Sequence, residues 1–192
     1  MLVWVLVGIA GGAMVVALLL NGWRERMQKS RDFKTALRLA SSEMQGDIEL
    51  GSSWTANWDQ PAVKSLADEL EALGFRRIGA YGVESFAGLE VYPLHALHAE
   101  AFAVVFRLPS TGTAWFELFG NMPDGRLLSV VSSPAMGGLP SSPGVLRVPL
   151  WSVRPKVAFG VFSRERLRLG GGVGPTPESD FELLFRRSME VG

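Results

Sequence analysis

Residues 101–133 read AFAVVFRLPSTGTAWFELFGNMPDGRLLSVVSS. This stretch holds three short runs rich in Val, Phe and Leu, which are Ala101–Leu108, Thr113–Gly120 and Arg126–Ser132. Runs of this composition, bounded by turn residues, predict β-strands. The turns Ser110–Gly112 and Asn121–Gly125 are too short for the crossover that parallel strands need. We therefore expect an antiparallel β-meander with the wholly apolar Ala101–Phe106 at its centre.

The segments on either side extend this sheet and supply helices that cover it. A helix is predicted between Pro61, which suits a first turn, and Gly74, which suits a C-terminal stop. Further strands are predicted at Phe75–Val83, Gly88–Tyr92, Val145–Trp151 and Val157–Phe162, with an exposed edge strand where Arg164, Arg166 and Arg168 alternate with other residues. The soluble part is thus an α+β domain, an antiparallel β-meander sheet packed by one or two helices.

The strongest single signal lies at the start of the chain. Residues 2–20 contain no charged or strongly polar side chain, and a membrane-spanning helix needs roughly 17–25 such residues. Trp4 and Trp23 mark the ends of this run at a helical distance of about 28 Å, and tryptophan favours the membrane interface. A cleavable signal peptide is the alternative, but the first charge, Arg24, follows the apolar run. We expect a single-pass transmembrane anchor at residues 1–23.

The charges that follow the apolar run predict its orientation. Residues 24–38 carry six basic and two acidic side chains, and the residues before them carry none. Positive flanks remain cytoplasmic, so we expect the N-terminus outside and the soluble domain on the cytoplasmic side of the inner membrane. Arg24, Arg26 and Lys29 are then placed to contact lipid headgroups from a basic, amphipathic juxtamembrane helix at residues 24–46.

Small residues within the apolar run suggest a helix-packing face. Gly8 and Gly12 have the GxxxG spacing, and Gly11 lies beside them. Such residues let a second transmembrane helix approach the backbone closely. Glycine is also common in membrane helices without this role, so both interpretations stay open.

The domain boundaries follow from these patterns. The anchor and the juxtamembrane helix precede an α+β domain at residues 47–169. Residues 170–192 begin with the run Gly170–Gly174, which predicts a hinge, and continue as a C-terminal helix after Thr176. The glycine run lacks the Lys-Ser/Thr pair of a phosphate-binding loop and the pattern of a dinucleotide-binding turn.

The two histidines of the chain lie close together in the pattern His95-x-x-His98-x-Glu100. Imidazole and carboxylate groups are ligands for Zn, Fe or Mn, which makes these three residues a weak candidate for a metal site. We expect them instead in a surface loop at residues 93–100, because in a strand positions 95 and 98 would point to opposite faces. No metal or other cofactor is therefore expected.

Composition excludes several other classes of function. The chain has 192 residues, 19 basic and 19 acidic side chains, and no cysteine, which excludes thiolate metal sites and a cysteine nucleophile. It contains no G-x-S-x-G sequence, and its basic residues lack the pattern of a nucleic-acid interface. Between residues 43 and 100 ten acidic and three basic side chains predict a solvated acidic surface or a docking face for a basic partner.

These observations lead us to expect a non-catalytic accessory or scaffold subunit of an integral membrane protein complex. Its partners would be membrane lipid and other integral membrane subunits, and bacterial respiratory and photosynthetic assemblies are candidate hosts. The alternative is a membrane-tethered sensor or small-ligand-binding module that uses a pocket between sheet and helix. A third hypothesis is a membrane-bound enzyme with a site at His95, His98 and Glu100.

Overall fold

A computed structural model describes residues 50–52, 57–83, 88–96, 98, 100–133, 142–151, 153–171 and 176–189. They belong to the compact unit Leu39–Gly192. The predicted anchor, the juxtamembrane helix and the small-residue face at Gly8, Gly11 and Gly12 lie outside the described residues, as do Trp4, Trp23, Arg24, Arg26 and Lys29. Among the helices that are described, none has both the length and the apolar character needed to span a bilayer.

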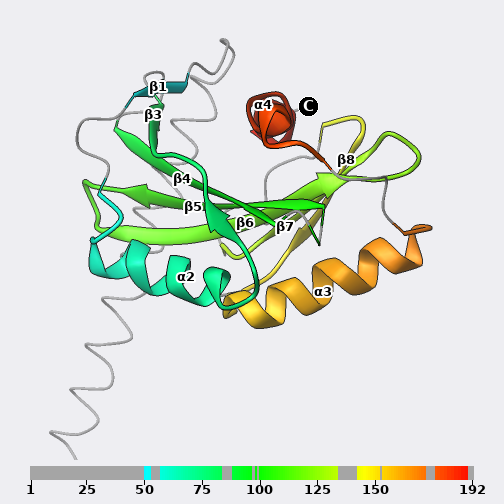
Figure 1. Cartoon of the computed structure of the whole chain (residues 1–192), viewed down its shortest axis with the longest axis horizontal. Helices are drawn as coiled ribbons and strands as arrows, with labels where there is room; N and C mark the ends of the chain where they lie inside the picture. The colour runs from blue at the N-terminus through cyan, green and yellow to red at the C-terminus, as the bar shows by residue number, and fades with distance from the viewer. Residues whose placement is uncertain are drawn as a thin grey trace, which may run out of the picture. The chain divides into compact units, whose positions relative to one another are not determined.

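The predicted meander forms the centre of an eight-stranded sheet (Figure 1). Its antiparallel strands are β4 (Leu89–Ala96), β5 (Ala101–Leu108), β6 (Thr113–Asn121) and β7 (Leu127–Val131). Residue Phe102 pairs with Phe119, and Phe119 pairs with Ser129, so the register follows from the two short turns. Strand β3 (Tyr81–Val83) continues the sheet beyond β4, and β1 (Leu50–Ser52) pairs with β3. The prediction of antiparallel strands from residues 101–133 is confirmed.

One strand departs from the predicted antiparallel order. Strand β8 (Val145–Pro149) pairs with β7 in parallel, and Leu128 lies opposite Leu146. The connection from β7 to β8 spans thirteen residues, which is long enough for a crossover between parallel neighbours. The sheet is therefore mostly, rather than wholly, antiparallel.

Strand β4 contains Pro93 in its middle and continues beyond Tyr92, where the predicted strand Gly88–Tyr92 ends. The carbonyl oxygen of Pro93 accepts a hydrogen bond from the amide of Ile78, so the proline nitrogen faces the same neighbouring edge. That edge is divided between β3 and the two-residue strand β2 (Arg76–Arg77). Because Pro93 lies at the gap between these two partners, its missing N–H interrupts no strand pairing. The prediction of a surface loop at residues 93–100 is therefore wrong for residues 93–96, which belong to β4.

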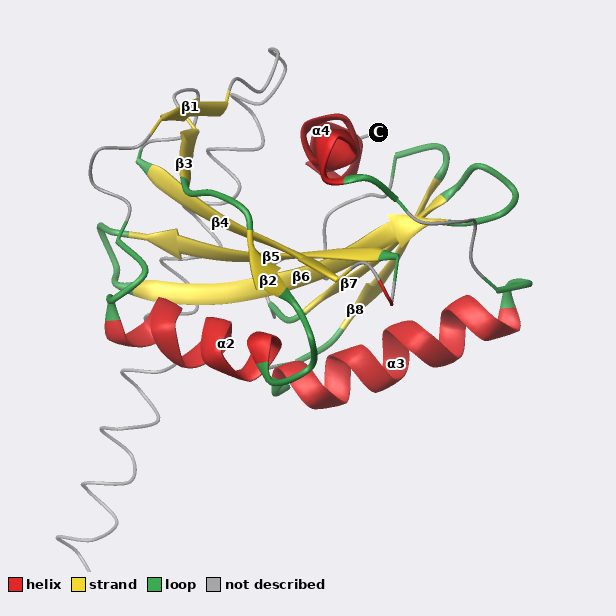
Figure 2. Ribbon diagram, in the orientation of Figure 1, coloured by secondary structure: helices red, strands yellow, loops and turns green. Residues whose placement is uncertain are grey.

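Helices cover both faces of the sheet (Figure 2). Helices α2 (Pro61–Glu71) and α3 (Pro155–Arg168) lie on one face, and α4 (Phe181–Met189), preceded by the short helix η3 (Glu178–Asp180), lies on the other. Three helices thus pack on the sheet where one or two were expected. The predicted strands at Val157–Phe162 and at Arg164–Arg168 are one helix: Pro155 begins it, and Ala158 and Phe162 are buried one turn apart.

The face under α2 and α3 carries a continuous apolar core. Alternate residues of the central strands point into it, because side chains of a strand alternate between its faces. Its fully buried members include Leu94, Ala103, Val105, Phe116, Leu118 and Val130 from the strands, with Leu70 from α2 and Phe162 from α3. Burial of one such Leu or Phe side chain contributes about 1.5–3 kcal/mol to folding. This core fixes α3 against the sheet and thereby places the residues of the candidate site.

Candidate functional site

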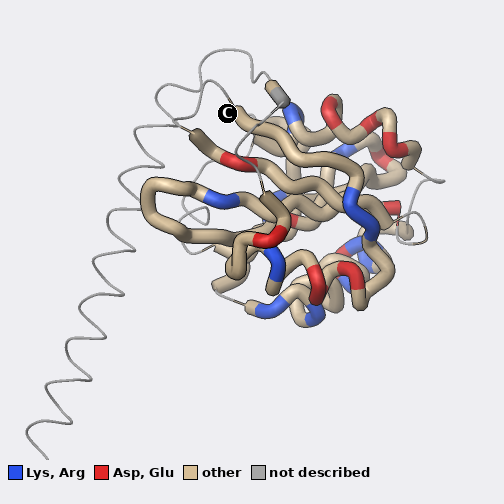
Figure 3. The backbone as a smooth tube through the Cα atoms, turned by 60° about the vertical axis from the view of Figure 1, so that its left-hand side comes forward, with Lys and Arg blue, Asp and Glu red and all other residues tan. Residues whose placement is uncertain are grey.

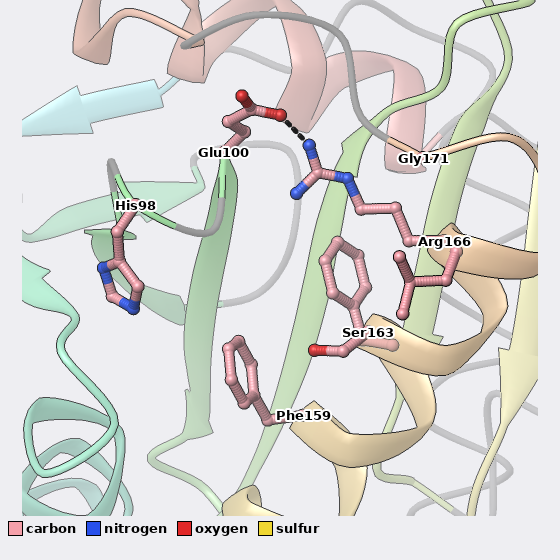
Figure 4. A pocket seen from close by; sticks show the side chains of 8 residues that line it. His98, Glu100, Phe159, Ser163, Arg166 and Gly171 are labelled. Carbon is pink, nitrogen blue, oxygen red and sulfur yellow. Dashed lines mark hydrogen bonds and ion pairs between the residues drawn. The ribbon is translucent and has the colours of Figure 1, made fainter.

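A cavity of about 410 Å³ opens between helix α3 and the segment that connects β4 to β5. The connecting segment contributes His98 and Glu100. Helix α3 and the residues after it contribute Phe159, Phe162, Ser163, Arg166, Leu167 and Gly171. Figure 4 shows His98 across the pocket from α3, with Glu100 and Arg166 meeting at one end. The pocket thus combines two phenyl rings, a hydroxyl, an imidazole and a pair of opposite charges.

The backbone at Glu100 adopts an unusual conformation. Its φ of 46° lies in the left-handed region, which non-glycine residues adopt at a cost. The turn is held close to the sheet, since a Cβ atom added to Gly120 in β6 would lie 2.8 Å from the carbonyl oxygen of Glu100. The absence of a side chain at Gly120 therefore allows this turn to pack where it presents the Glu100 carboxylate to the pocket.

Arg166 forms an ion pair with Glu100. It lies one turn after Phe162 on α3, and the burial of Phe162 in the core turns this part of the helix toward the pocket. Burial lowers the pKa of the Arg166 guanidinium, but arginine stays charged at neutral pH. Because the pair is largely removed from water, its charges are screened less than those of surface pairs. A polar ligand would meet a strong local field here.

His98 is placed by the end of helix α2. Gly74 follows the helix with a φ of 90°, and a Cβ atom there would lie 2.5 Å from Cε1 of His98. The imidazole therefore packs directly on the backbone of Gly74. In the part of the chain that is described, no carboxylate forms an ion pair with this ring.

His95 does not belong to the pocket. It is buried in β4, where Nε2 donates a hydrogen bond of 2.8 Å to the carbonyl oxygen of Thr176 and the ring stacks on Phe102. Phe102 and its neighbour Phe119 both contact Phe181 of α4, so His95 faces away from α3. Within the described residues, no three His, Asp or Glu side chains converge as a metal site would require. The structure brings His98 and Glu100 together with Arg166 and separates them from His95.

A second polar cluster, which the sequence analysis did not single out, lies beneath α4. Glu117 in β6 is fully buried, and its Oε1 accepts a hydrogen bond of 2.6 Å from Ser129 in β7. Arg147 in β8 donates to the carbonyl oxygen of Ser188 in α4. Glu117 Oε2 and Arg147 Nε and Nη1 are buried and have no hydrogen-bond partner among the described residues. A lone acidic residue within the apolar run Trp115–Phe119 was the available signal for this cluster.

Burial raises the pKa of the Glu117 carboxyl, while the charge of Arg147 and the hydrogen bond from Ser129 act in the opposite direction. The cluster connects three neighbouring strands to the backbone of α4. We interpret it as the contact that positions this helix. The pocket beside α3 is the candidate functional site.

The predicted acidic surface is partly neutralised by ion pairs. On α2, Asp68 lies 2.6 Å from the ammonium of Lys64 and 3.3 Å from the guanidinium of Arg77. Arg77 also pairs with Glu71, and Glu69 pairs with Arg154. Figure 3 shows acidic and basic positions interspersed over the domain. These pairs reduce the charge that a basic partner would meet on α2.

Comparison of the chain with models of protein families, with curated proteins and with solved structures finds no match.

Proposed function

We propose that the α+β domain is a small-ligand-binding module, tethered to the membrane by the predicted anchor at residues 1–23. The observation that carries this proposal is the pocket in which phenyl rings adjoin a largely buried pair of opposite charges. Ligand sites commonly combine apolar walls with a few placed polar groups. The ligand we infer has an apolar body that packs on Phe159 and Phe162 and a polar end that reaches Arg166 and Glu100.

The same geometry favours binding over catalysis. Glu100 is engaged by Arg166, and a carboxylate held in an ion pair is a weak general base. His98 has no described carboxylate to orient it, and His95 faces the other side of the sheet. We therefore do not propose a catalytic or metal site at His95, His98 and Glu100.

A screen of the full-length chain in mild detergent tests the proposal. Small carboxylates, amines and neutral aromatic compounds are added, and the midpoint of thermal unfolding is measured. A compound that binds the folded state raises this midpoint as its concentration rises. We expect the rise to disappear in Ser163→Phe, whose larger side chain would fill the pocket.

Arg164→Ala is the matched control, because this neighbouring residue does not line the pocket. The Ser163→Phe variant must unfold at the midpoint of the unliganded wild type for the comparison to hold. If every active compound stabilises Ser163→Phe as strongly as wild type, the pocket is not the binding site. If none of the three compound classes stabilises the wild type, the proposal is wrong.

A second proposed function is that of accessory subunit in an integral membrane complex, without a catalytic role. It is favoured by large apolar side chains that the described domain leaves exposed, among them Trp151 and Leu183. Extraction of native membranes in gentle detergent, followed by size separation and mass spectrometry, would identify co-migrating subunits. On this proposal Gly8→Leu and Gly12→Leu release the protein from its complex. Migration of the wild type as a lone chain would contradict it.

The location that both functions require is likewise a proposal. It places the N-terminus outside the inner membrane and the α+β domain in the cytoplasm. Protease added to sealed right-side-out vesicles should leave the domain intact. Digestion of the domain from outside would overturn this orientation.

A further inference from the structure

The outer face of helix α3, which points away from the sheet, exposes large apolar side chains. The buried side chains of the helix, Pro155, Ala158 and Phe162, pack toward the sheet. On the opposite side Val157 is 54% exposed and Leu167 is 76% exposed, and Trp151 shortly before the helix is 70% exposed. Of the four large hydrophobic side chains that the described residues expose, three therefore belong to residues 151–167. The fold does not bury this apolar surface.

Basic side chains lie between these apolar positions. Lys156 and Arg164 are exposed, and neither forms an ion pair with any described residue. Arg168 lies on the same side and pairs with Glu165, the one acidic residue of the helix. At 100° per residue, Lys156, Val157, Arg164, Leu167 and Arg168 fall within about 120° of the helix circumference. The exposed face of α3 thus alternates cations with apolar side chains and carries no unpaired acid.

The middle of this face is occupied by Gly160. Glycine within a helix is destabilising relative to alanine. A Cβ atom at Gly160 would have no heavy atom within 4 Å, so packing inside the domain does not require glycine there. A residue without a side chain does let a flat external surface approach the helix backbone.

We propose that the outer face of α3, together with Trp151, lies on the surface of an anionic lipid bilayer. Basic side chains close to the surface of an anionic bilayer are attracted to its headgroups. Val157, Leu167 and the tryptophan ring enter the interface between headgroups and acyl chains, as in interfacial amphipathic helices. Tryptophan is suited to this depth because its ring is apolar and its N–H is polar.

The composition of the face selects lipid over a protein partner. A protein-binding patch typically has an apolar centre and a polar rim, whereas here the cations are interspersed among the apolar side chains. This inference concerns the outside of α3 and does not depend on ligand binding in the pocket. It would hold the domain at the membrane in a defined orientation.

Because the chain contains no cysteine, a single labelled position reports on one face. In the full-length Val157→Cys variant, the new cysteine is labelled with an environment-sensitive fluorophore. The labelled protein is reconstituted into nanodiscs of phosphatidylcholine with or without phosphatidylserine. Val157 is chosen because, unlike Leu167, it does not line the pocket. Leu183→Cys on α4 is the control for an exposed apolar residue on the other side of the sheet.

We expect the label at position 157 to shift to shorter emission wavelength, and to be quenched by brominated lipid, only when phosphatidylserine is present. Lys156→Glu combined with Arg164→Glu should abolish the shift, as should about 1 M salt, where charges are screened beyond about 3 Å. The label at position 183 should not respond. An unchanged unfolding midpoint in the charge-reversed variant would show that its loss of binding is not a loss of folding.

Two results would overturn the proposal. Equal emission from positions 157 and 183 in both kinds of nanodisc would show that α3 does not contact lipid. A shift at position 157 that persists without phosphatidylserine, and rises with protein concentration in detergent, would instead assign the face to a second copy of the chain.

Discussion

The two faces of the central sheet are held together by different kinds of interaction. The face under α2 and α3 is filled mainly by aliphatic and aromatic side chains, and one of its described polar clusters lies near one end of β4. There Glu90 accepts hydrogen bonds of 2.8 Å from Tyr92 and 2.7 Å from Arg107. Burial and the bond to Glu90 raise the pKa of the Tyr92 phenol to about 12.

The face under α4 combines stacked aromatic rings with buried polar groups. The ring centroids of Phe181 and Phe185 in α4 lie 5.5 Å apart. Both rings pack on aromatic rings of the strands. Glu117 is buried in β6 beneath α4, and Arg147 reaches the backbone of this helix. Apolar burial is strong but non-directional, whereas hydrogen bonds require one geometry. We infer that apolar burial stabilises both faces, and that the polar contacts of the α4 face in addition fix the position of its helix.

The largest effect should come from the apolar face. Leu118→Ala removes a fully buried side chain beneath α2 and α3 and should lower the free energy of unfolding by about 2–5 kcal/mol. Denaturant unfolding of the full-length chain in mild detergent measures this loss. Leu183→Ala, at an exposed position, should change stability by less than about 0.5 kcal/mol. Equal losses in the two variants would show that the burial of Leu118 does not contribute to stability.

The next effect concerns the contact between the sheet and the pocket. Gly120→Ala would place a Cβ atom 2.8 Å from the Glu100 carbonyl oxygen and 3.3 Å from Phe162. Because the neighbouring atom is backbone, overpacking should cost about 1–3 kcal/mol in the same unfolding measurement. If ligand binding is found, its affinity should fall as well, since Glu100 moves. A variant as stable as wild type would mean that the turn at Glu100 shifts freely.

The buried carboxyl of the α4 face should make the stability of the domain depend on pH. The unfolded Glu117 carboxyl titrates near 4.5, and burial raises its pKa in the folded state. The folded state therefore retains this proton more tightly, and stability is lost as pH rises from 4.5 through the folded pKa. Glu117→Gln cannot ionise, so the difference between variant and wild type should grow over this range.

This difference amounts to about 1.4 kcal/mol for each unit of raised pKa. Unfolding curves measured at a series of pH values compare the variant with wild type. Ser129→Ala serves as a control that removes the hydrogen bond and keeps the carboxyl. A glutamine variant that becomes less stable relative to wild type as pH rises would mean that the Glu117 carboxylate stabilises the fold through Arg147.

The smallest effect is a gain on the outer face of α3. Gly160→Ala should stabilise the domain by about 0.5–1 kcal/mol, because alanine favours the helix and nothing obstructs its Cβ atom. Unfolding in detergent, away from any bilayer, isolates this gain. A loss of stability would show that Gly160 is needed for packing, and would weaken the argument that its role is external.

Sequence patterns predict the structure correctly where strands that follow one another in the chain also pair with one another in the sheet. Strands β5 to β7 are apolar over most of their length and are joined by short turns, so neighbours in sequence are neighbours in space. Helix α3 was missed because Val157 and Leu167 lie on its exposed side and obscure the helical period. The end of β4 was missed because a proline usually terminates a strand, and its tolerance depends on the gap between β2 and β3.

The candidate site was predictable only in part. His98 and Glu100 were noted because they lie close in sequence. The partner of Glu100, Arg166, is 66 residues away in the sequence, where the pattern predicts an edge strand, and its approach to Glu100 depends on how α3 packs. The separation of His95 from His98 likewise requires the true end of β4. Such contacts arise from tertiary packing, which local patterns do not encode.

The outermost strands of the sheet have a consequence for how the domain behaves among its own copies. Among the described strands, β1 at one edge is three residues long, and β8 at the other ends at Pro149, which cannot donate a backbone hydrogen bond. Long, unbroken edges invite strands of other molecules to pair with them, and short or proline-bearing edges discourage it. A domain crowded onto a membrane surface would meet its neighbours often, and these edges would keep such encounters from becoming intermolecular sheets.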